Sequence, residues 1–358
     1  MKTLVVLGAG KIGRMVTHFL ATCGDYQVRV GDVHGPSAEA AAEGLENAEG
    51  KAIDFTSQAD LDAILDGASG VLSCAPYHCN PLIAERAKAK GAHYFDLTED
   101  VAVTRKVKEL ADGAKSAFMP QCGLAPGFIT IVGHHLIEDM SEVHDLRLRV
   151  GALPKSPRNR MAYNLSWSTE GLINEYCNPC EVVRNGELIE VPPLEDVERI
   201  LIEGIEYEAF HTSGGLGTLA DSLRGKVRNL DYKTMRYPGH VELLRFLLHD
   251  LQFEHHRDDL RAIFERSLPL TEQDRIAIYT SAIGIVDGQL TERVDARCVD
   301  HKEIDGKNWT GIQITTAAGI CAVVDLMMQG QLPTEGFVRQ EQVAYPQFLA
   351  NRFGRYYG

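Results

Sequence analysis

The sequence predicts an α/β fold in two parts: a doubly wound parallel sheet, followed by a second, mixed α/β domain. Three observations support this prediction. Apolar runs of strand length alternate with segments of helical periodicity through residues 1–124. A glycine-rich loop follows the first of these runs. Beyond Gly151 the pattern changes, because apolar and polar residues alternate as they do on half-solvated strands.

The strands and helices of the first part are expected to alternate along the chain. Residues 3–7 form a continuous apolar run, typical of a buried parallel strand, and apolar residues recur at helical spacing from Ile12 to Cys23. Asn80-Pro81 predicts a helix start, with Asn80 as its N-cap, and Gly91 predicts the end of that helix. We expect strands at 3–7, 27–30, 51–55, 70–75, 93–97 and 117–121, with helices at 12–23, 37–45, 61–65, 80–91 and 101–114.

The second part is expected to contain an open antiparallel sheet. Asn185-Gly186 separates two apolar runs, which is a strong signal for a β-hairpin. An apolar stripe near the end of the chain, at residues 320–328 and followed by Gly330, predicts a further helix. The strands are expected at 146–150, 181–183, 188–191, 207–210 and 275–286. The predicted domains are residues 1–124 and 125–311, with a C-terminal segment at 312–358.

Composition narrows the classes of function. The net charge is −14, so we expect no nucleic-acid or anionic-membrane partner, since both need a positive surface. No apolar run is judged long enough to span a membrane, and the N-terminus lacks the pattern of a signal peptide. The eight cysteines form no disulfide framework, and the Cys177–Cys180 pair has no second pair to complete a zinc site. We therefore expect a cytoplasmic protein that holds no metal.

The glycine-rich loop has the pattern of a Rossmann dinucleotide-binding motif. Gly8 allows a tight turn, Gly10 lets the backbone approach a pyrophosphate, and Gly13 lets helix and strand pack closely. Asp32 follows at the end of the second strand, where a carboxylate can bind the adenosine ribose. NAD is therefore the expected cofactor, with NADP possible because Arg14 and His34 are nearby cations. The expected contacts in the loop are Gly8, Gly10, Lys11, Ile12, Gly13 and Asp32.

Other cofactor contacts are expected where further parallel strands end, since ligands bind at the carboxyl edge of such sheets. Cys74, Ala75 and Pro76 follow the fourth strand and are expected beside the cofactor. Asp54 follows the third strand and either lies near the adenine or forms a plain turn.

Three further segments carry a resemblance to a known family. They are CAPYH at residues 74–78, QCGLAPG at 121–127 and, as the most specific, KTMRYPGH at 233–240. With the glycine loop, they make the chain resemble the saccharopine dehydrogenase family, which includes saccharopine reductases and lysine 6-dehydrogenases. The resemblance implies a Rossmann domain, a substrate domain that commonly mediates dimerisation, and a C-terminal helix that returns to the Rossmann domain. It implies NAD(P)-dependent oxidation of a C–N bond in a lysine-derived amino acid.

Saccharopine is the expected substrate, and lysine is the alternative, because the middle domain is short for a saccharopine reductase. A more distant alternative is an NAD-binding sensor without catalysis. Oxidation of an amine requires a base, since an ammonium nitrogen has no lone pair to assist hydride loss. The catalytic candidates at the strand ends are Tyr77, Asp96, Glu99 and Cys122. Tyr77 and Cys122 lie in segments that resemble active-site segments of saccharopine reductases.

The second domain is expected to bind the substrate carboxylates. Arg224, Lys226, Arg228, Lys233 and Arg236 form a basic stretch in an otherwise acidic chain, and arginine forks suit carboxylates. A solvated basic face is the alternative for the first three of these cations. The expected substrate contacts are Arg224, Lys233, Arg236, Tyr237 and His240. The expected partners are a small amino-acid substrate and a second copy of the chain.

Overall fold

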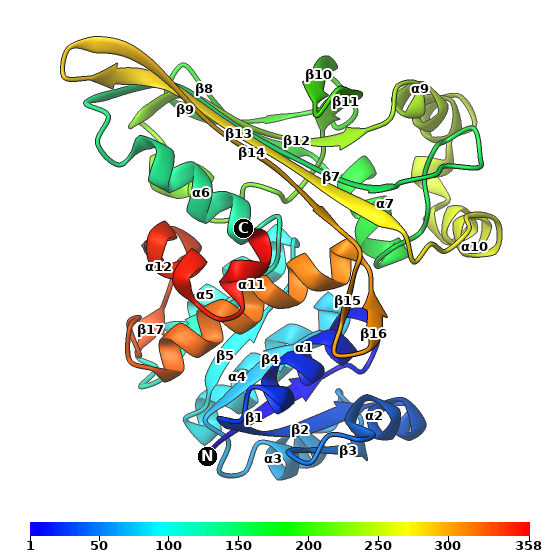
Figure 1. The fold of residues 1–358 in the computed structure, drawn as a ribbon, viewed down its shortest axis with the longest axis vertical. Coiled ribbons are helices and arrows are strands. Elements are labelled where there is room, and N and C mark those ends of the chain that lie inside the picture. Colours follow the sequence, from blue (N-terminus) through cyan, green and yellow to red (C-terminus); the bar gives the residue numbers. More distant parts are fainter. The chain divides into compact units, whose positions relative to one another are not determined.

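The computed structural model describes residues 1–358, and the chain divides into two compact units (Figure 1). Unit 1 contains Met1–Ile131 and Gln313–Gly358, and unit 2 contains Val132–Ile312. Unit 1 is therefore built from two separated stretches of sequence. Helices α6 (Phe128–Ile137) and α11 (Gly311–Met328) carry the chain across the two boundaries.

Unit 1 is a seven-stranded sheet in the order β17-β6-β5-β4-β1-β2-β3, and every neighbouring pair is parallel. The predicted doubly wound parallel sheet is confirmed. Its strands are β1 (Lys2–Leu7), β2 (Tyr26–Asp32), β3 (Ala48–Ala52), β4 (Gly70–Ser73), β5 (His93–Asp96), β6 (Ala117–Met119) and β17 (Gly336–Phe337). Its helices are α1 (Lys11–Thr22), α2 (Gly35–Ala42), α3 (Gln58–Ile64), α4 (Asn80–Lys90), α5 (Val101–Ala111) and α12 (Tyr345–Ala350).

Two local predictions in unit 1 are wrong. The third strand was expected at 51–55, but β3 ends at Ala52; Ile53 and Phe55 lie in the following turn and pack into the core. Their apolar character reflects core packing outside the strand. Asn80 does not cap α4, because its side chain accepts a hydrogen bond from Ser73 Oγ at 2.7 Å. Gly91 ends α4 in the left-handed conformation, as predicted (φ 69°).

Helix α11 is the predicted C-terminal helix, and it packs in the core of unit 1. A Cβ at Gly319 would lie 2.5 Å from the carbonyl oxygen of Gly123, so only glycine permits this close approach. Asp325 on the same helix accepts a hydrogen bond from Tyr26 at 2.6 Å and one from Asn351 at 2.7 Å. The last segment of the chain is thus tied to the first strands of the sheet.

Helix α11 also corrects the expectation that no apolar run reaches the length of a membrane span. Its 18 residues have a mean hydropathy of 1.6, which suffices by length and composition alone. However, 89% of the helix is buried inside the protein, and the core helix of a soluble domain has the same properties. We interpret α11 as a core helix.

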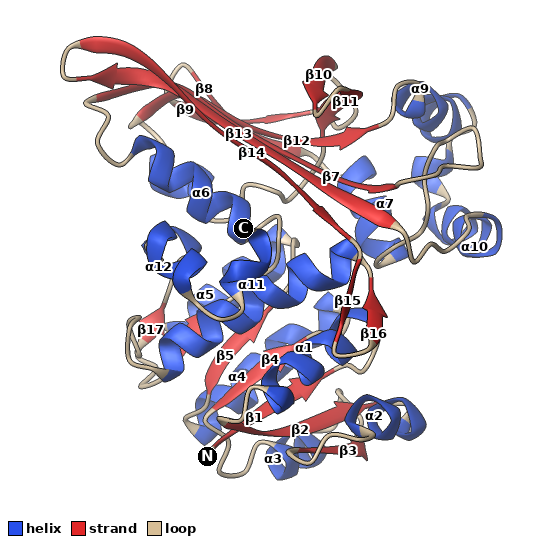
Figure 2. Ribbon diagram, viewed as in Figure 1, coloured by secondary structure: helices blue, strands red, loops and turns tan.

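Unit 2 is a mixed sheet in the order β10-β11-β12-β7-β13-β14, with β8 pairing with β12 and β9 (Figure 2). The β12–β7 pair is parallel, so the expectation of an open antiparallel sheet is corrected at this pair. Its strands are β7 (Glu142–Pro154), β8 (Cys180–Arg184), β9 (Glu187–Val191), β10 (Glu198–Ile202), β11 (Ile205–His211), β12 (Val227–Arg236), β13 (Asp274–Val286) and β14 (Gln289–Asp300). A small hairpin, β15 (Lys302–Ile304) and β16 (Lys307–Trp309), stands apart from this sheet.

Helices of unit 2 pack over part of the sheet and enclose a separate apolar cluster. The helices are α7 (Thr169–Cys177), α8 (Leu219–Leu223), α9 (His240–Arg245) and α10 (Arg257–Ser267). The cluster includes Leu172 and Tyr176 of α7, Leu244 of α9 and Phe264 of α10. This packing holds α7 and the start of α9 in place near the end of β12.

Candidate functional site

The glycine loop of unit 1 has the geometry that a dinucleotide requires. Gly8 has φ +99°, and a Cβ there would lie 2.6 Å from the carbonyl oxygen of Cys74. A Cβ at Gly13 would lie 1.8 Å from the carbonyl oxygen of Gly8, so helix α1 can approach β1 only without a side chain. A Cβ at Gly10 would meet nothing within 4 Å, and no side chain caps α1. The open backbone at this helix N-terminus fits a pyrophosphate, which helix N–H groups bind.

Asp32 ends β2 beside this loop. Its Oδ2 accepts a hydrogen bond from the Ala9 amide at 2.6 Å, and its Oδ1 accepts one from the His34 amide at 2.8 Å. A carboxylate offers about four lone-pair sites, so capacity for ribose hydroxyls remains. Asp32 therefore both shapes the glycine loop and places a negative charge at the position where a ribose would bind.

The remaining cofactor candidates have different surroundings. Asp54 is exposed, and its Oδ1 accepts hydrogen bonds from the amide and hydroxyl of Thr56 at 2.8 and 2.7 Å. This geometry is that of a strand-end turn. Cys74 contributes its backbone to the packing against Gly8, with Ala75 half-buried and Pro76 exposed beside it. Gln313 donates a hydrogen bond to the carbonyl of Lys11 at 2.9 Å, and Ile12 is half-buried.

Asp96 is fully buried at the end of β5. Its Oδ1 accepts hydrogen bonds from the amides of Thr98 and Gln121, and its Oδ2 accepts one from the Tyr94 hydroxyl at 2.7 Å. Burial raises the pKa of Asp96 to about 6, although these donors favour the ionised form. A carboxylate so engaged has a clear positioning role, because it fixes the loop that leads to Cys122.

Cys122 is 1% exposed, and its thiol donates to the Met119 carbonyl at 2.9 Å and accepts from the Gln340 side chain at 3.0 Å. Burial raises the pKa of this thiol well above its ordinary value, so it carries no thiolate at neutral pH. These contacts give Cys122 a packing role. Tyr77 begins a 3-10 turn and is half-buried, and Glu99 is half-buried after β5. Of the four catalytic candidates, Tyr77 and Glu99 are the two that are only half-buried.

The structure does not bring the basic stretch of unit 2 together. Arg224 lies before β12, is exposed and pairs with Glu187 at 3.1 Å. Lys233 and Arg236 both lie on β12, but successive side chains on a strand point to opposite faces. An odd and an even position therefore cannot converge on one ligand. Tyr237 donates to the Pro154 carbonyl at 2.9 Å and stacks on Tyr207.

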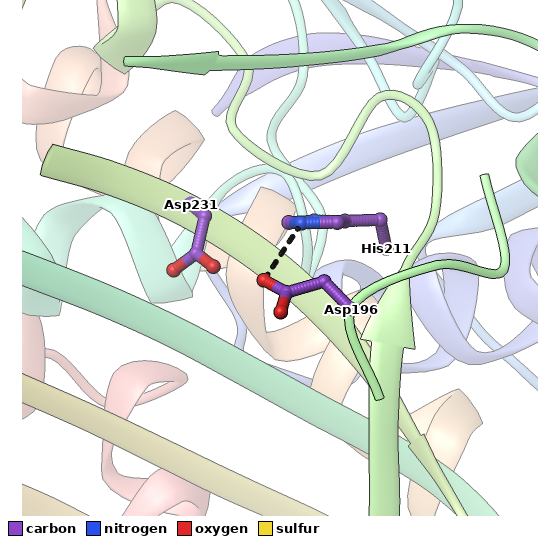
Figure 3. Close-up of side chains that lie close together, drawn as sticks. All are labelled: Asp196, His211 and Asp231. Atoms are coloured by element: carbon purple, nitrogen blue, oxygen red, sulfur yellow. Dashed lines mark ion pairs between the residues drawn. The ribbon is translucent and has the colours of Figure 1, made fainter. Parts of the chain in front are cut away.

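Lys233 lies in an ion-pair cluster rather than in an open site. In the same cluster, Asp196, His211 and Asp231 offer metal-ligating atoms within 4.8 Å of one another (Figure 3). However, Lys233 Nζ lies 3.0 Å from Asp196 Oδ2, and Arg149 donates to Asp231 at 3.0 Å. Since these cations already neutralise the carboxylates, we infer no metal here. The cluster fastens the loop that contains Asp196 to the sheet.

Arg236 lies on the opposite face in a buried polar relay. His240 Nδ1 lies 2.7 Å from the Met161 carbonyl, which can only accept, so Nδ1 carries the proton. Burial and Arg236 lower the pKa of His240 to about 3, which leaves its Nε2 a neutral acceptor for the Tyr176 hydroxyl at 3.2 Å. Tyr176 in turn accepts from Arg236 Nε at 3.0 Å. The relay therefore fixes the orientation of the guanidinium.

The guanidinium of Arg236 has donors to spare. Its Nη1 donates to the carbonyl of Met235 at 3.0 Å, so only two of the five N–H groups of an arginine are engaged. The ring of Tyr163 lies 4.9 Å from the guanidinium carbon, and Glu175 Oε2 lies 3.8 Å from Nη2. Arg236 is 3% exposed, so a ligand carboxylate would meet a desolvated, pre-oriented fork.

Sequence reasoning missed Tyr163, Glu175 and Tyr176 around this arginine. Glu175 lies on α7, where Leu172, Ile173 and Tyr176 are also buried. An acidic residue at a buried helical position was the available signal. Tyr163 lies outside regular secondary structure, and no periodicity points to it.

A parallel sheet with an open glycine loop and an acid at the end of β2 defines a dinucleotide-binding unit. Combined with a separate unit that holds a buried arginine fork, it defines an NAD(P)-dependent oxidoreductase. The chain belongs to the saccharopine dehydrogenase family. Residues 4–119 match the family's "Saccharopine dehydrogenase NADP binding domain" and residues 123–355 match its "Saccharopine dehydrogenase C-terminal domain".

Similar proteins support this assignment. The chain is 22% identical to the saccharopine dehydrogenase [NADP(+), L-glutamate-forming] of Pyricularia oryzae, over 92% of this chain and 77% of that protein. It is 24% identical to the enzyme of the same name from Schizosaccharomyces pombe, where the match covers 53% of this chain and only 44% of that protein. The structure of apo saccharopine dehydrogenase (L-Glu forming) from Saccharomyces cerevisiae superposes with a TM-score of 0.81 at 16% identity, covering 98% of this chain and 96% of that one. The last comparison shows the shared fold.

Proposed function

We propose that this protein oxidises saccharopine with NAD(P) by removing a hydride from a carbon bonded to the secondary amine. The relatives named above are saccharopine dehydrogenases, which gives the substrate class. The observation that carries the proposal is Arg236, a buried guanidinium with three unengaged N–H groups in unit 2. Glu175 lies 3.8 Å from this guanidinium but accepts none of its free donors, and saccharopine has three carboxylates that can accept them.

The protein's own residues have distinct parts in this reaction. The glycine loop and Asp32 would hold the dinucleotide, whose nicotinamide would supply the hydride acceptor. Arg236 binds a substrate carboxylate, and the His240–Tyr176 relay keeps its fork oriented. Tyr77 and Glu99 are the proposed groups for handling the amine proton, because they are half-buried polar residues that follow strands at the carboxyl edge of the sheet. Asp96 and Cys122 hold the neighbouring loops in place.

Asp32 supports NAD as the preferred cofactor within the NAD(P) class. Its negative charge favours ribose hydroxyls and repels a 2′-phosphate, whereas the curated relatives are named as NADP(+) enzymes. Arg14 donates to the Ala9 carbonyl at 3.2 Å and lies close enough to the loop to soften this preference. The test is the ratio of kcat/KM for the two cofactors.

The decisive experiment is a screen for reduction of NAD and NADP by the purified protein with saccharopine, lysine, ornithine and carboxyspermidine. Turnover with saccharopine and not with lysine supports the proposal. Turnover with lysine alone identifies a lysine 6-dehydrogenase. Cofactor binding without turnover of any amine would indicate an NAD-binding sensor without catalysis, and the enzyme proposal then fails. Arg236→Ala should lower the affinity for saccharopine in this assay. Its matched control is Arg261→Ala, which removes an exposed cation on α10.

We also propose a homodimer formed through the sheet of unit 2. Its edge strand β14 exposes two apolar side chains that share one side of the strand, Leu290 at 68% and Val294 at 50%. Exposed apolar surface of this kind favours association. Light scattering of the purified chain tests the dimer, and a Leu290→Lys variant that shifts it to monomer would support this face.

All eight cysteines are free, which favours the reducing environment of the cytoplasm, and fractionation of cells tests that location.

A further inference from the structure

The carboxylate of Glu175 is an unusual group in unit 2. The residue is 8% exposed, and its Oε2 is buried without any hydrogen-bond partner. Its nearest cationic nitrogen, Nη2 of Arg236, lies at 3.8 Å, which is beyond hydrogen-bonding distance. A buried acceptor left unpaired costs free energy. The folded protein is therefore less stable with this arrangement unless a ligand donates a hydrogen bond to Glu175.

The two groups differ in what they lack. Arg236 has unengaged donors, and Glu175 has an unengaged acceptor. They stand side by side, held by β12 and by α7, and the Tyr163 ring packs against the guanidinium. A ligand that satisfies both must present an acceptor, which an anion supplies best, beside a hydrogen-bond donor, which a cation supplies best. An α-amino acid head, with its carboxylate and ammonium on one carbon, has this chemistry.

We propose that Glu175 and Arg236 together bind the zwitterionic α-amino-acid head of the substrate, with Glu175 accepting from the ammonium and Arg236 donating to the carboxylate. This inference rests on the proposed function and makes it more specific. Saccharopine and lysine share the same L-lysine head, so the clamp recognises the part common to both. Glu175 is then a specificity-determining residue, because it rejects molecules that carry a carboxylate without the adjacent ammonium.

The neighbourhood of Glu175 supports an ammonium partner. Burial raises the pKa of Glu175 to about 7 against the opposing effect of Arg236. A cation that donates to Oε2 would restore the ionised form, so the site gains a paired carboxylate only when the ligand is bound. The amide of Ser213 donates to the backbone carbonyl of Glu175 at 3.0 Å and fixes this end of α7.

The test compares binding of L-saccharopine with that of its des-amino analogue, N-(5-carboxypentyl)-L-glutamate. Calorimetric titration of the full chain with reduced cofactor present avoids turnover, since saccharopine cannot be oxidised by it. We expect the wild-type protein to bind saccharopine about 10- to 100-fold more tightly, the range of one charged hydrogen bond. In Glu175→Gln this preference should collapse to within about threefold, with binding of the analogue nearly unchanged.

Controls separate this result from simple damage. Glu265→Gln, an exposed glutamate paired with Arg261 on α10, should keep the full preference. Arg236→Lys should weaken saccharopine and the analogue alike, because both keep the carboxylate. Glu175→Asp, which retains charge but shortens the side chain, should restore part of the preference. The thermal unfolding of each variant shows that it is folded.

Two outcomes overturn the inference in distinguishable ways. If Glu175→Gln weakens both ligands equally or neither, Glu175 does not contact the ammonium, and the proposed function is untouched. If the wild-type protein binds neither saccharopine nor L-lysine with reduced cofactor, the proposed substrate class itself fails, and the clamp fails with it.

Discussion

Neutralising Glu175 should stabilise the protein at high pH, even though it weakens substrate binding. Burial raises the pKa of this carboxyl from 4.5 to about 7 in the folded protein. The folded state then binds more protons than the unfolded state between these values, so stability is greatest at low pH and falls as pH rises. One pKa unit corresponds to about 1.36 kcal/mol, so Glu175 should cost the native state about 2.5 kcal/mol between pH 5 and pH 8.

The assay is urea unfolding of the wild-type protein and of Glu175→Gln at about pH 5 and pH 8. The difference between the two proteins should be small at the lower pH and should reach about 2–3 kcal/mol in favour of the variant at the higher pH. Subtracting the two curves removes the contribution of other titrating groups, such as Asp96, whose pKa is raised to about 6. Glu265→Gln should show no such pH dependence. A difference that stays constant with pH, or that favours the wild-type protein at pH 8, would refute the reasoning.

Three further predictions follow from the site. Arg236→Ala should raise KM for saccharopine about 10- to 150-fold with cofactor affinity unchanged. Arg236→Lys should restore only part of the lost affinity for saccharopine, because an ammonium cannot form the two parallel hydrogen bonds of a guanidinium. Normal kinetics with a lowered Tm would show that Arg236 has only a structural role. Asp32→Ala should weaken NAD binding about tenfold and narrow the preference for NAD over NADP, since a charged hydrogen bond to the ribose is lost. Fluorescence titration measures both affinities. An unchanged ratio of the two affinities would mean that Asp32 only shapes the glycine loop. Cys122→Ser should keep turnover within about threefold, because serine preserves the donor to Met119. Tyr77→Phe should lower kcat about 100-fold if the Tyr77 hydroxyl transfers a proton. Steady-state kinetics of the two variants shows which of the two residues takes part in the reaction.

Much of unit 1 could be predicted from sequence because its signals are local. A buried parallel strand is a continuous apolar run, and the glycine loop is specified by contacts among residues close in the chain. Strand β3 was misplaced for a physical reason. Its exposed sequence, AEGKA, carries little apolar signal, whereas Ile53 and Phe55 are apolar because they fill the core beyond the strand.

Unit 2 was harder because its organisation depends on distant pairing. Strand β12 carries charged residues that look solvated in sequence, yet it pairs with β7 and β11 in the middle of the sheet. Period-two alternation separates Lys233 from Arg236, which a one-dimensional cluster of cations cannot reveal. Glu175 joins Arg236 only through tertiary packing of α7, so no spacing rule in the sequence connects them.

Unit 1 is built from two segments of the chain that are separated by unit 2, and this affects how it folds during synthesis. Strand β1 emerges from the ribosome early, whereas α11 and the Asp325 contacts with Tyr26 and Asn351 are supplied only after all of unit 2. Part of the apolar interior of unit 1 therefore stays uncovered until residues 313–358 have been synthesised. Unit 2 is continuous in sequence and can close its own core first. Truncation near the C-terminus should thus harm the unit that begins at the N-terminus.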